Sequence, residues 1–338
     1  MLQIFATAVN AILPIVLMIL LGYFLRRAGF FTESFAKTGN KLVFYLFLPC
    51  SLFMSVYRIE SFAAIRWDII GYAMSIVIVL FVLGLCCAVL STKVPQRRGV
   101  ILQCAFRSNI AIIGISLAAA LGDSNAEALA SILAAFTVPV YNVLAVIALS
   151  VFTESPSGKK SPGDILKNIL RNPLIIGSLL GMLCLGLRGL QIRLWGEVVI
   201  SLSGQGKVLY TVISNLKAVA SPFALVMLGG QFTFSAIKSL WREICAGTLF
   251  RIVLAPLIGV ALAVVLAKQG ILNCGINEFP ALVALFGAPV AGSSAVMAGQ
   301  MGNDEQLATQ LVVWTSIGSI GTIFVTVCIL MSMGLLAV

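Results

Sequence analysis

The sequence predicts an all-α membrane protein with ten transmembrane helices, arranged as two inverted repeats of five helices each. Three observations predict this fold: the composition, the alternation of long apolar runs with polar breaks, and the likeness of the two halves. The 338-residue chain is 60% hydrophobic and 10% charged, whereas a soluble globular domain is about 45–50% apolar and about 25% charged. A soluble fold of this length cannot bury so many apolar side chains, so the composition indicates a bilayer environment.

Ten apolar runs are long enough to cross a bilayer, because a spanning helix needs about 20 residues. Charged residues or Gly/Pro clusters separate them. Their approximate ranges are 5–25, 41–57, 69–92, 101–120, 128–152, 172–190, 209–231, 243–267, 280–299 and 307–336.

The charges beside these runs predict the orientation of the chain. Arg26 and Arg27 follow the first run and no basic residue precedes it, which is the reverse of a signal peptide, so we expect this run to remain as a helix. The connections after spans one, three, five and seven carry 13 Lys and Arg, and the opposite connections carry 6. The positive-inside rule then places both termini outside, in a multi-pass protein of the cell (inner) membrane.

The chain divides into two repeats, residues 1–152 and 172–338, joined by a polar linker over 153–171 that we expect in the cytoplasm. Residues 107–130 resemble residues 287–310 in pattern: a helix-breaking cluster, an apolar stretch, a Gly-acidic turn and a new helix. Each repeat has an odd number of spans, so the second enters the membrane in the opposite sense. Inverted repeats are typical of secondary transporters.

Helix-breaking residues recur in the fourth and ninth spans. An interrupted helix in lipid needs protein or water to satisfy its free backbone groups, and two half-helix N-termini that meet near the midplane attract an anion. Small residues of this kind also allow close helix packing without any site. The candidate site residues in these spans are Arg107, Ser108, Asn109, Gly114, Ser116, Pro289, Gly292, Ser293 and Ser294.

Some basic residues lie well inside predicted spans. Arg107 and Arg251 lie eight or nine residues beyond charged positions, so each either reaches membrane depth and attracts an anion or extends to the cytoplasmic headgroups. Lys217 lies near an outer helix end and is predicted to extend to the headgroups. No acidic residue lies clearly in the middle of a span, so the sequence does not indicate proton coupling through a buried carboxylate.

Polar residues in two other spans are further binding candidates. Asn10 lies in the first span, and Tyr141 and Asn142 lie in the fifth. Each either bonds a neighbouring helix or contacts a ligand. Pro139 precedes the Tyr141-Asn142 pair and predicts a local kink, which favours a cavity-facing position.

The sequence argues against an enzyme. It contains no histidine, which removes Ser-His-Asp hydrolysis, HExxH zinc sites and histidine proton relays. The 8 cysteines include no CxxC pair and indicate buried packing, so no cofactor and no metal site is expected. The net charge of +10 fits membrane topology and does not point to nucleic acid.

Five stretches in order along nearly the whole chain resemble the auxin efflux carrier family, the prokaryotic relatives of plant PIN-type transporters. They are KLVFYLFLPCSLF (41–53), FRSNIAIIGISLA (106–118), VPVYNVLAV (138–146), SPFALVMLGGQF (221–232) and GAPVAGSSAVMAGQMGND (287–304). The resemblance implies a scaffold from spans one, two, six and seven, and a transport domain from spans three to five and eight to ten. It also implies that broken helices four and nine cross within the transport domain.

The resemblance further implies that a weak organic acid binds beside the crossing and moves by an elevator-like displacement. Mapped onto this chain, Asn109 and Pro289 lie at the crossing, Ser293 and Ser294 lie beside it, and Tyr141 with Asn142 faces it. A homodimer through the scaffold is also implied. The family often has proline where this chain has Ser116, so span four is expected to unwind less than span nine.

The predicted function is a secondary transporter of a small organic anion, a mono- or dicarboxylate such as malate or malonate, or an auxin-like weak acid. The predicted mechanism is elevator-type alternating access, with no enzyme activity. Two alternatives stay open: a sodium-coupled carrier of the bile-acid symporter type, and a membrane sensor or assembly subunit that binds ligand without transport.

Overall fold

The structure, a computed structural model, describes residues 2–58, 66–152 and 170–336, together with 154–155, 158–159, 163 and 167. The described chain is helical, apart from two strands of two residues each, β1 (Glu154–Ser155) and β2 (Gly158–Lys159), which pair antiparallel. These strands lie in the predicted linker, most of which lies outside the described residues. Seven of the described helices are long and apolar enough to cross a membrane.

Residues 2–152, as far as the structure describes them, contain long helices and one interrupted segment. Its elements are α1 (Leu2–Arg27), α2 (Glu33–Leu42), the π-helical turn η1 (Val43–Phe47), α3 (Leu48–Tyr57), α4 (Trp67–Ser91), α5 (Pro95–Phe106), the π-helical turn η2 (Ile110–Gly114), α6 (Ile115–Leu121) and α7 (Ser124–Val151). Helices α2 and α3 are continuous through η1 and form one candidate span, Glu33–Tyr57.

Residues 170–336 also contain long helices and one interrupted segment. Its elements are α9 (Pro173–Trp195), α10 (Lys207–Gln231), α11 (Ser235–Leu249), the π-helical turns η3 (Phe250–Leu254) and η4 (Leu257–Ala261), α12 (Leu262–Lys268), α13 (Phe279–Gly287), α14 (Ser293–Gln300) and α15 (Glu305–Ser332). Helices α11 and α12 join through η3 and η4 into one candidate span, Ser235–Lys268.

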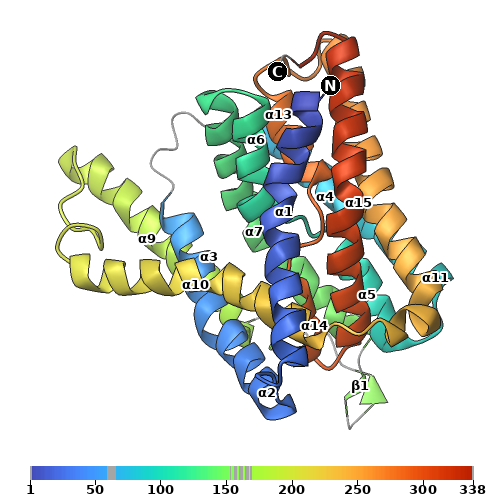
Figure 1. The fold of residues 1–338 in the computed structure, drawn as a ribbon. Coiled ribbons are helices and arrows are strands. Elements are labelled where there is room, and N and C mark those ends of the chain that lie inside the picture. The colour runs from blue at the N-terminus through green and yellow to red at the C-terminus, as the bar shows by residue number, and fades with distance from the viewer. Residues whose placement is uncertain are drawn as a thin grey trace.

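The predicted spans fall on these elements in order. Seven correspond to the candidate spans, and the other three fall on α1, on α5 with α6, and on α13 with α14. Helix α1 begins and helix α15 ends at the same end of the molecule (Figure 1). A chain whose two ends lie on one side of a bilayer crosses it an even number of times.

The helices pack in two groups. Helix α1 packs on α10, and α3 packs on both α9 and α10. In the other group, α5 packs on α4 and α7, α13 packs on α7, and α15 packs on α11 and α14. Helix α9 and the first half of α10 extend to one side of the molecule, away from α11 and α15 (Figure 1). Helix α1 contacts both groups, since it also packs on α15.

Glycines bring the backbones of the first group close together. A Cβ atom on Gly229 of α10 would overlap the Ile19 carbonyl of α1, and one on Gly22 would overlap the Val226 carbonyl in the reverse direction. Gly177 of α9 approaches the Pro49 backbone of α3 in the same way. Because lipid gives helices no hydrophobic reason to associate, such close packing supplies much of the attraction between them.

Polar contacts fix the ends of helices in the second group. The Asp123 carboxylate caps α7 by accepting from the amides of Asn125 and Ala126, and these bonds lower the pKa of Asp123. Arg97 of α5 pairs with Glu243 of α11 at 3.0 Å and with Asp304, the N-cap of α15, at 3.0 Å. Three helices that are distant in sequence are thereby tied at one end.

Gly229→Ala is expected to weaken the packing of α1 on α10. The added methyl overlaps backbone of α1, which cannot move aside like a side chain, and overpacking of this kind costs about 1–3 kcal/mol. The midpoint of thermal unfolding in detergent should fall. Gly71→Ala is the control, since nothing lies within 4 Å of a Cβ there, and it should leave the midpoint unchanged or raise it. Equal midpoints for the two variants would contradict this account of the packing.

Candidate functional site

The first helix interruption lies between α5 and η2. Helix α5 ends at Phe106, and Arg107 adopts an extended backbone with φ −80° and ψ 97°. Helical structure resumes at Ile110. The Asn109 carbonyl accepts from the amides of Ile113 at 3.0 Å and Gly114 at 3.2 Å, so Asn109 begins the second half-helix. The break covers three residues, and all three are buried.

The second interruption lies between α13 and α14. Helix α13 ends at Gly287, Ala288 is extended with ψ 146°, and α14 begins at Ser293. Pro289 lacks an amide donor, so it cannot continue a helical ladder here. This break covers five residues, two more than the first.

The two interruptions cross and hydrogen-bond to each other. Ser108 pairs with Val290 as an isolated antiparallel bridge. The Asn109 amide donates to the Pro289 carbonyl at 2.9 Å, and the Ala291 amide donates to the Arg107 carbonyl at 3.4 Å. Each break therefore satisfies backbone groups that the other leaves free, as a broken helix away from water requires.

Thr315 of α15 supports this crossing from behind. Its Oγ1 accepts from the Val290 amide at 3.2 Å and donates to the Leu311 carbonyl at 2.6 Å. The side chain is fully buried.

Arg107 extends its guanidinium from the crossing among neutral partners. Its Nη2 donates to Asn142 Oδ1 at 2.9 Å and to Ser293 Oγ at 3.1 Å, and its Nη1 lies 2.8 Å from the Met297 sulfur. The residue is only 4% exposed, and no carboxylate pairs with it among the described residues. A buried cation with neutral partners leaves a net positive charge, which favours an anion beside it.

Arg251 of η3 is also buried but has a different environment. Its Nε and Nη2 donate to the Ala288 carbonyl at 3.0 and 2.7 Å, and its Nη2 also reaches the carbonyls of Leu285 and Phe286 at 3.2 and 3.3 Å. These oxygens form the C-terminal end of α13, where the helix dipole is negative. Arg251 thus caps the half-helix, and it does not line the cavity described next.

A cavity of about 380 Å³ lies against the crossing. The first helix group contributes Ser51, Ser55, Arg58, Lys217 and Ser221. The second group contributes Arg107, Ser108, Asn109, Ser131, Tyr141, Asn142 and Ser293, and apolar residues from both groups complete the lining. Among the residues that the structure describes, three basic side chains and no acidic one line it, which makes this lining electropositive.

The structure brings six of the predicted site residues together. Arg107, Ser108, Asn109, Tyr141, Asn142 and Ser293 line the cavity. The Ser108 hydroxyl and the Asn142 amide nitrogen are buried and have no hydrogen-bond partner in the described part of the chain. Pro289 forms the crossing itself, and Gly292 lines a smaller hollow of about 60 Å³ beside it.

The other predicted residues lie elsewhere. Gly114 packs closely against the Ala284 carbonyl of α13, and the hydroxyl of exposed Ser116 donates to the Ile112 carbonyl of its own helix at 3.2 Å. Ser294 is fully buried, and Asn10 is exposed on α1. None of these four lines the cavity.

Sequence reasoning missed two cavity cations and several hydroxyls. Lys217, predicted to extend to the headgroups, is half-buried and lines the cavity. Arg58 was counted only as a loop charge, but it lines the cavity and donates to Ser214 at 3.0 Å. No local sequence signal distinguished these two residues from a headgroup contact.

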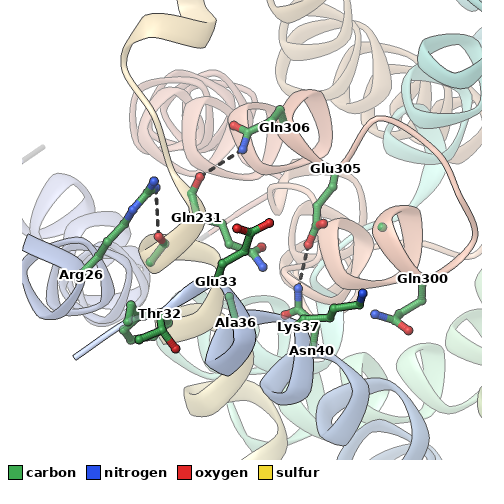
Figure 2. Close-up of a pocket in the computed structure, with 13 residues that line it drawn as sticks. Arg26, Thr32, Glu33, Ala36, Lys37, Asn40, Gln231, Gln300, Glu305 and Gln306 are labelled. Carbon is green, nitrogen blue, oxygen red and sulfur yellow. Dashed lines mark hydrogen bonds between the residues drawn. The ribbon is translucent and has the colours of Figure 1, made fainter. Parts of the chain in front are cut away.

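A second cavity of about 610 Å³ lies at the other end of the same helices. Figure 2 shows its lining from α1, α2, α10, α14 and α15. The first cavity touches α3 at Ser51, α10 at Ser221 and α14 at Ser293, whereas the second touches α2 at Asn40, α10 at Gln231 and α14 at Gln300. At 1.5 Å per helical residue, Asn40 and Ser51 are about 16 Å apart along their helix.

Hydrogen bonds join the two helix groups across this second cavity. Asn40 of α2 donates to the Glu305 carboxylate of α15 at 2.7 Å, and Gln306 donates to the Gln231 carbonyl of α10 at 3.3 Å (Figure 2). The first cavity has no such cross-link among the hydrogen bonds of its described lining residues.

Comparisons with known proteins indicate a membrane transporter. A family model described as "Membrane transport protein" matches residues 7–327. An "Uncharacterized transporter" from Methanothermobacter thermautotrophicus is 22% identical over 325 residues, which cover 94% of this chain and 97% of that protein.

A disulfide tests the crossing directly. Ser108 and Val290 form the non-hydrogen-bonded pair of the bridge, whose Cα atoms are typically about 4.5 Å apart, within the range that a disulfide accepts. In a background without the native cysteines, Ser108→Cys with Val290→Cys is expected to cross-link on mild oxidation, measured by mass spectrometry of the joined peptides. Ser108→Cys with Val283→Cys, two turns back along α13, should not. Equal cross-linking in both pairs would contradict the crossing.

Proposed function

The chain belongs to the membrane transport protein family, the family of the auxin efflux carriers, and from this premise we propose that it carries a small organic anion. The substrate is a mono- or dicarboxylate, of the size of malate or malonate, or an auxin-like weak acid. The observation that carries the proposal is the electropositive cavity at the crossing, where Arg107 has only neutral partners.

The cavity chemistry suits a carboxylate. The guanidinium of Arg107 presents paired N–H donors that match the two oxygens of a carboxylate. The Ser108 hydroxyl and the Asn142 amide nitrogen are buried without a hydrogen-bond partner among the described residues, so both are available to a ligand. Arg58 directly follows α3, Lys217 lies within α10, and both line the cavity, where they raise the local concentration of anions.

The crossing adds a second source of positive potential. The half-helix from Ile110 to Leu121 and helix α14 both begin at the crossing, so their N-terminal dipole ends face the same region. Each N-terminus carries a partial positive charge that favours an anion nearby.

The two cavities support an alternating-access mechanism. They lie at opposite ends of the same helices, and each is lined by both helix groups. We propose that α1, α2–α3, α9 and α10 form a scaffold, and that α4–α7 with α11–α15 moves past it as the transport domain. Displacement along the helices would then expose the Arg107 site first to one side and next to the other.

We further propose ten bilayer crossings in two inverted repeats. The even count fits the position of both chain ends at one end of the molecule (Figure 1). Strand β1 lies at the opposite end (Figure 1), which agrees with a cytoplasmic linker and external termini. A homodimer through the scaffold helices stays a prediction.

Arg251 favours a carrier that does not require sodium. A coupling cation needs a cluster of oxygen ligands, and unwound carbonyls at a helix C-terminus supply one. Here the carbonyls of Leu285, Phe286 and Ala288 already receive the Arg251 guanidinium. A tethered cation thus occupies the oxygens that a sodium-coupled carrier would offer.

Arg107→Gln is expected to raise the KM for carboxylate flux into proteoliposomes by about 10–100-fold, because one charged hydrogen bond contributes about 1.5–3 kcal/mol. Arg107→Lys should raise the KM by a smaller factor, since the lysine ammonium keeps the charge but lacks the planar pair of donors. Arg193→Gln is the matched control. It removes the same charge, but from a residue that is exposed at the end of α9. An unchanged KM in Arg107→Gln, with the same protein level, would remove Arg107 from substrate binding.

Asn109→Ala and Pro289→Ala test the crossing in transport. Asn109→Ala removes a side-chain amide that lines the cavity, and Pro289→Ala restores a backbone N–H that allows helical structure to extend into the break. The backbone hydrogen bonds of the crossing are kept in both variants. Each is expected to lower the maximal flux of carboxylate while leaving the amount of protein in the vesicles unchanged. Unchanged rates in both variants would remove these two side chains from the mechanism.

Replacement of Na⁺ by K⁺ or choline on both sides of the vesicle is expected to leave carboxylate flux unchanged. The physical reason is the Arg251 guanidinium at the α13 carbonyls. A fall of tenfold or more without Na⁺ would support the sodium-coupled alternative.

A further inference from the structure

An apolar groove of about 170 Å³ runs along the contact between α1 and α15. Leu20 and Phe24 of α1 and Val313, Trp314 and Ile317 of α15 line it. Leu20, Phe24 and Ile317 are 43%, 62% and 44% exposed, so the groove opens on the outer surface of the helix bundle, which faces lipid. Its apolar lining suits part of an acyl chain.

The groove continues into a hollow of about 340 Å³ at the end of α1. The two share Tyr23, Phe232 and Phe234 in their linings, and the hollow adds Arg26 and Arg27. We call the groove and the hollow together the α1–α15 seam. An apolar slot that ends at two arginines has the order of an acyl chain and its headgroup.

The aromatic side chains place this junction at the membrane–water boundary. Tyr23 packs edge-on against Phe234 with ring centroids 5.7 Å apart, and Phe232 packs against Phe234 at 5.0 Å. Aromatic rings gather at the level of the headgroups, and α1 ends directly after them at Arg27.

The two arginines carry charge that no acidic residue in the lining balances. Arg26 donates through Nη1 to the Gly230 carbonyl at 3.2 Å, which leaves further N–H groups of its guanidinium for a ligand. The Arg27 guanidinium lies 5.3 Å above the centre of the Tyr23 ring, a contact that orients it. The described lining of the seam contains no Asp or Glu.

We propose that the α1–α15 seam binds one anionic phospholipid, with an acyl chain in the groove and the phosphate between Arg26 and Arg27. Basic pockets beside membrane helices recognise anionic headgroups in this way. A zwitterionic headgroup carries an additional cation, and the described lining of the seam contains no carboxylate that could pair with it. The inference is independent of the transported substrate.

The site has a consequence for motion, because α1 and α15 belong to different helix groups. A lipid seated between them contacts both and favours the arrangement in which the seam is intact. Anionic lipid is therefore expected to raise the thermal stability of this conformation.

Native mass spectrometry of the detergent-purified protein tests the proposal. With palmitoyl-oleoyl phosphatidylglycerol added, one lipid should be retained, and palmitoyl-oleoyl phosphatidylcholine at the same concentration should be retained much less. Inorganic phosphate should neither bind nor raise the midpoint of thermal unfolding. Equal retention of both lipids, or equal stabilisation by phosphate, would overturn the proposal.

Charge variants separate the seam from general surface attraction. Arg27→Gln should weaken phosphatidylglycerol binding about fivefold, and Arg26→Gln with Arg27→Gln about 25-fold, since each basic group near the headgroups contributes roughly that factor. Lys238→Gln with Arg242→Gln is the matched control: both residues are exposed on α11, on the same predicted side, and neither lines the seam. An equal loss in this control would show that only net surface charge attracts the lipid.

A groove variant tests the acyl chain. Ile317→Trp fills the groove while it remains apolar, and should lower phosphatidylglycerol retention at least fivefold without removing any charge. Unchanged retention in Ile317→Trp would overturn the proposed chain site.

The midpoint of thermal unfolding without added lipid is the folding control for the charge variants. Arg27→Gln keeps the hydrogen bond from Arg26 to Gly230, so its midpoint should equal that of the wild type and show that the variant folds.

Discussion

The structure depends on one constraint: a backbone interrupted inside a membrane protein must find its hydrogen bonds within the protein. Here the two interruptions supply them to each other, from the Asn109 amide to Pro289 and from the Ala291 amide to Arg107. An unsatisfied polar group in hydrocarbon costs several kcal/mol, so neither break is stable without the other. The crossing therefore fixes α5, α6, α13 and α14 relative to one another, and with them the cavity.

The same geometry gives the two buried arginines different roles. A broken helix presents a negative C-terminal end as well as a positive N-terminal end. The Arg251 guanidinium donates to the C-terminal carbonyls of α13. The Arg107 guanidinium instead donates to the side chains of Asn142 and Ser293 at the cavity. One guanidinium stabilises the fold of the crossing, and the other remains open to a ligand.

Sequence alone predicted the helices and the places where two of them break, because apolar runs and helix-breaking residues are local signals. The clusters around Asn109 and Pro289 coincide with the observed interruptions. The pairing of the breaks was indicated by their equivalent positions in the two predicted repeats and by the family resemblance, since a contact over about 180 positions leaves no local trace. The two alternatives stated for Arg251, an anion site or a headgroup contact, did not include a helix cap. Arg58 and Lys217 were missed because a basic residue in or beside an apolar run has the same local pattern whether it faces headgroups or a cavity.

The charge of the cavity bears on how the proposed carrier moves. Arg107 and Arg251 both lie in the proposed transport domain, and no carboxylate pairs with either in the described chain. An elementary charge that crosses the full membrane potential changes energy by about 2.3 kcal/mol per 100 mV. The empty domain would therefore respond to the potential as a cation, and a bound monocarboxylate would cancel one of its charges. A dicarboxylate would cancel two. The valence of the substrate would thus determine whether the loaded step is driven by the potential, and Arg107, the proposed anion ligand, is one of the two residues that set this dependence.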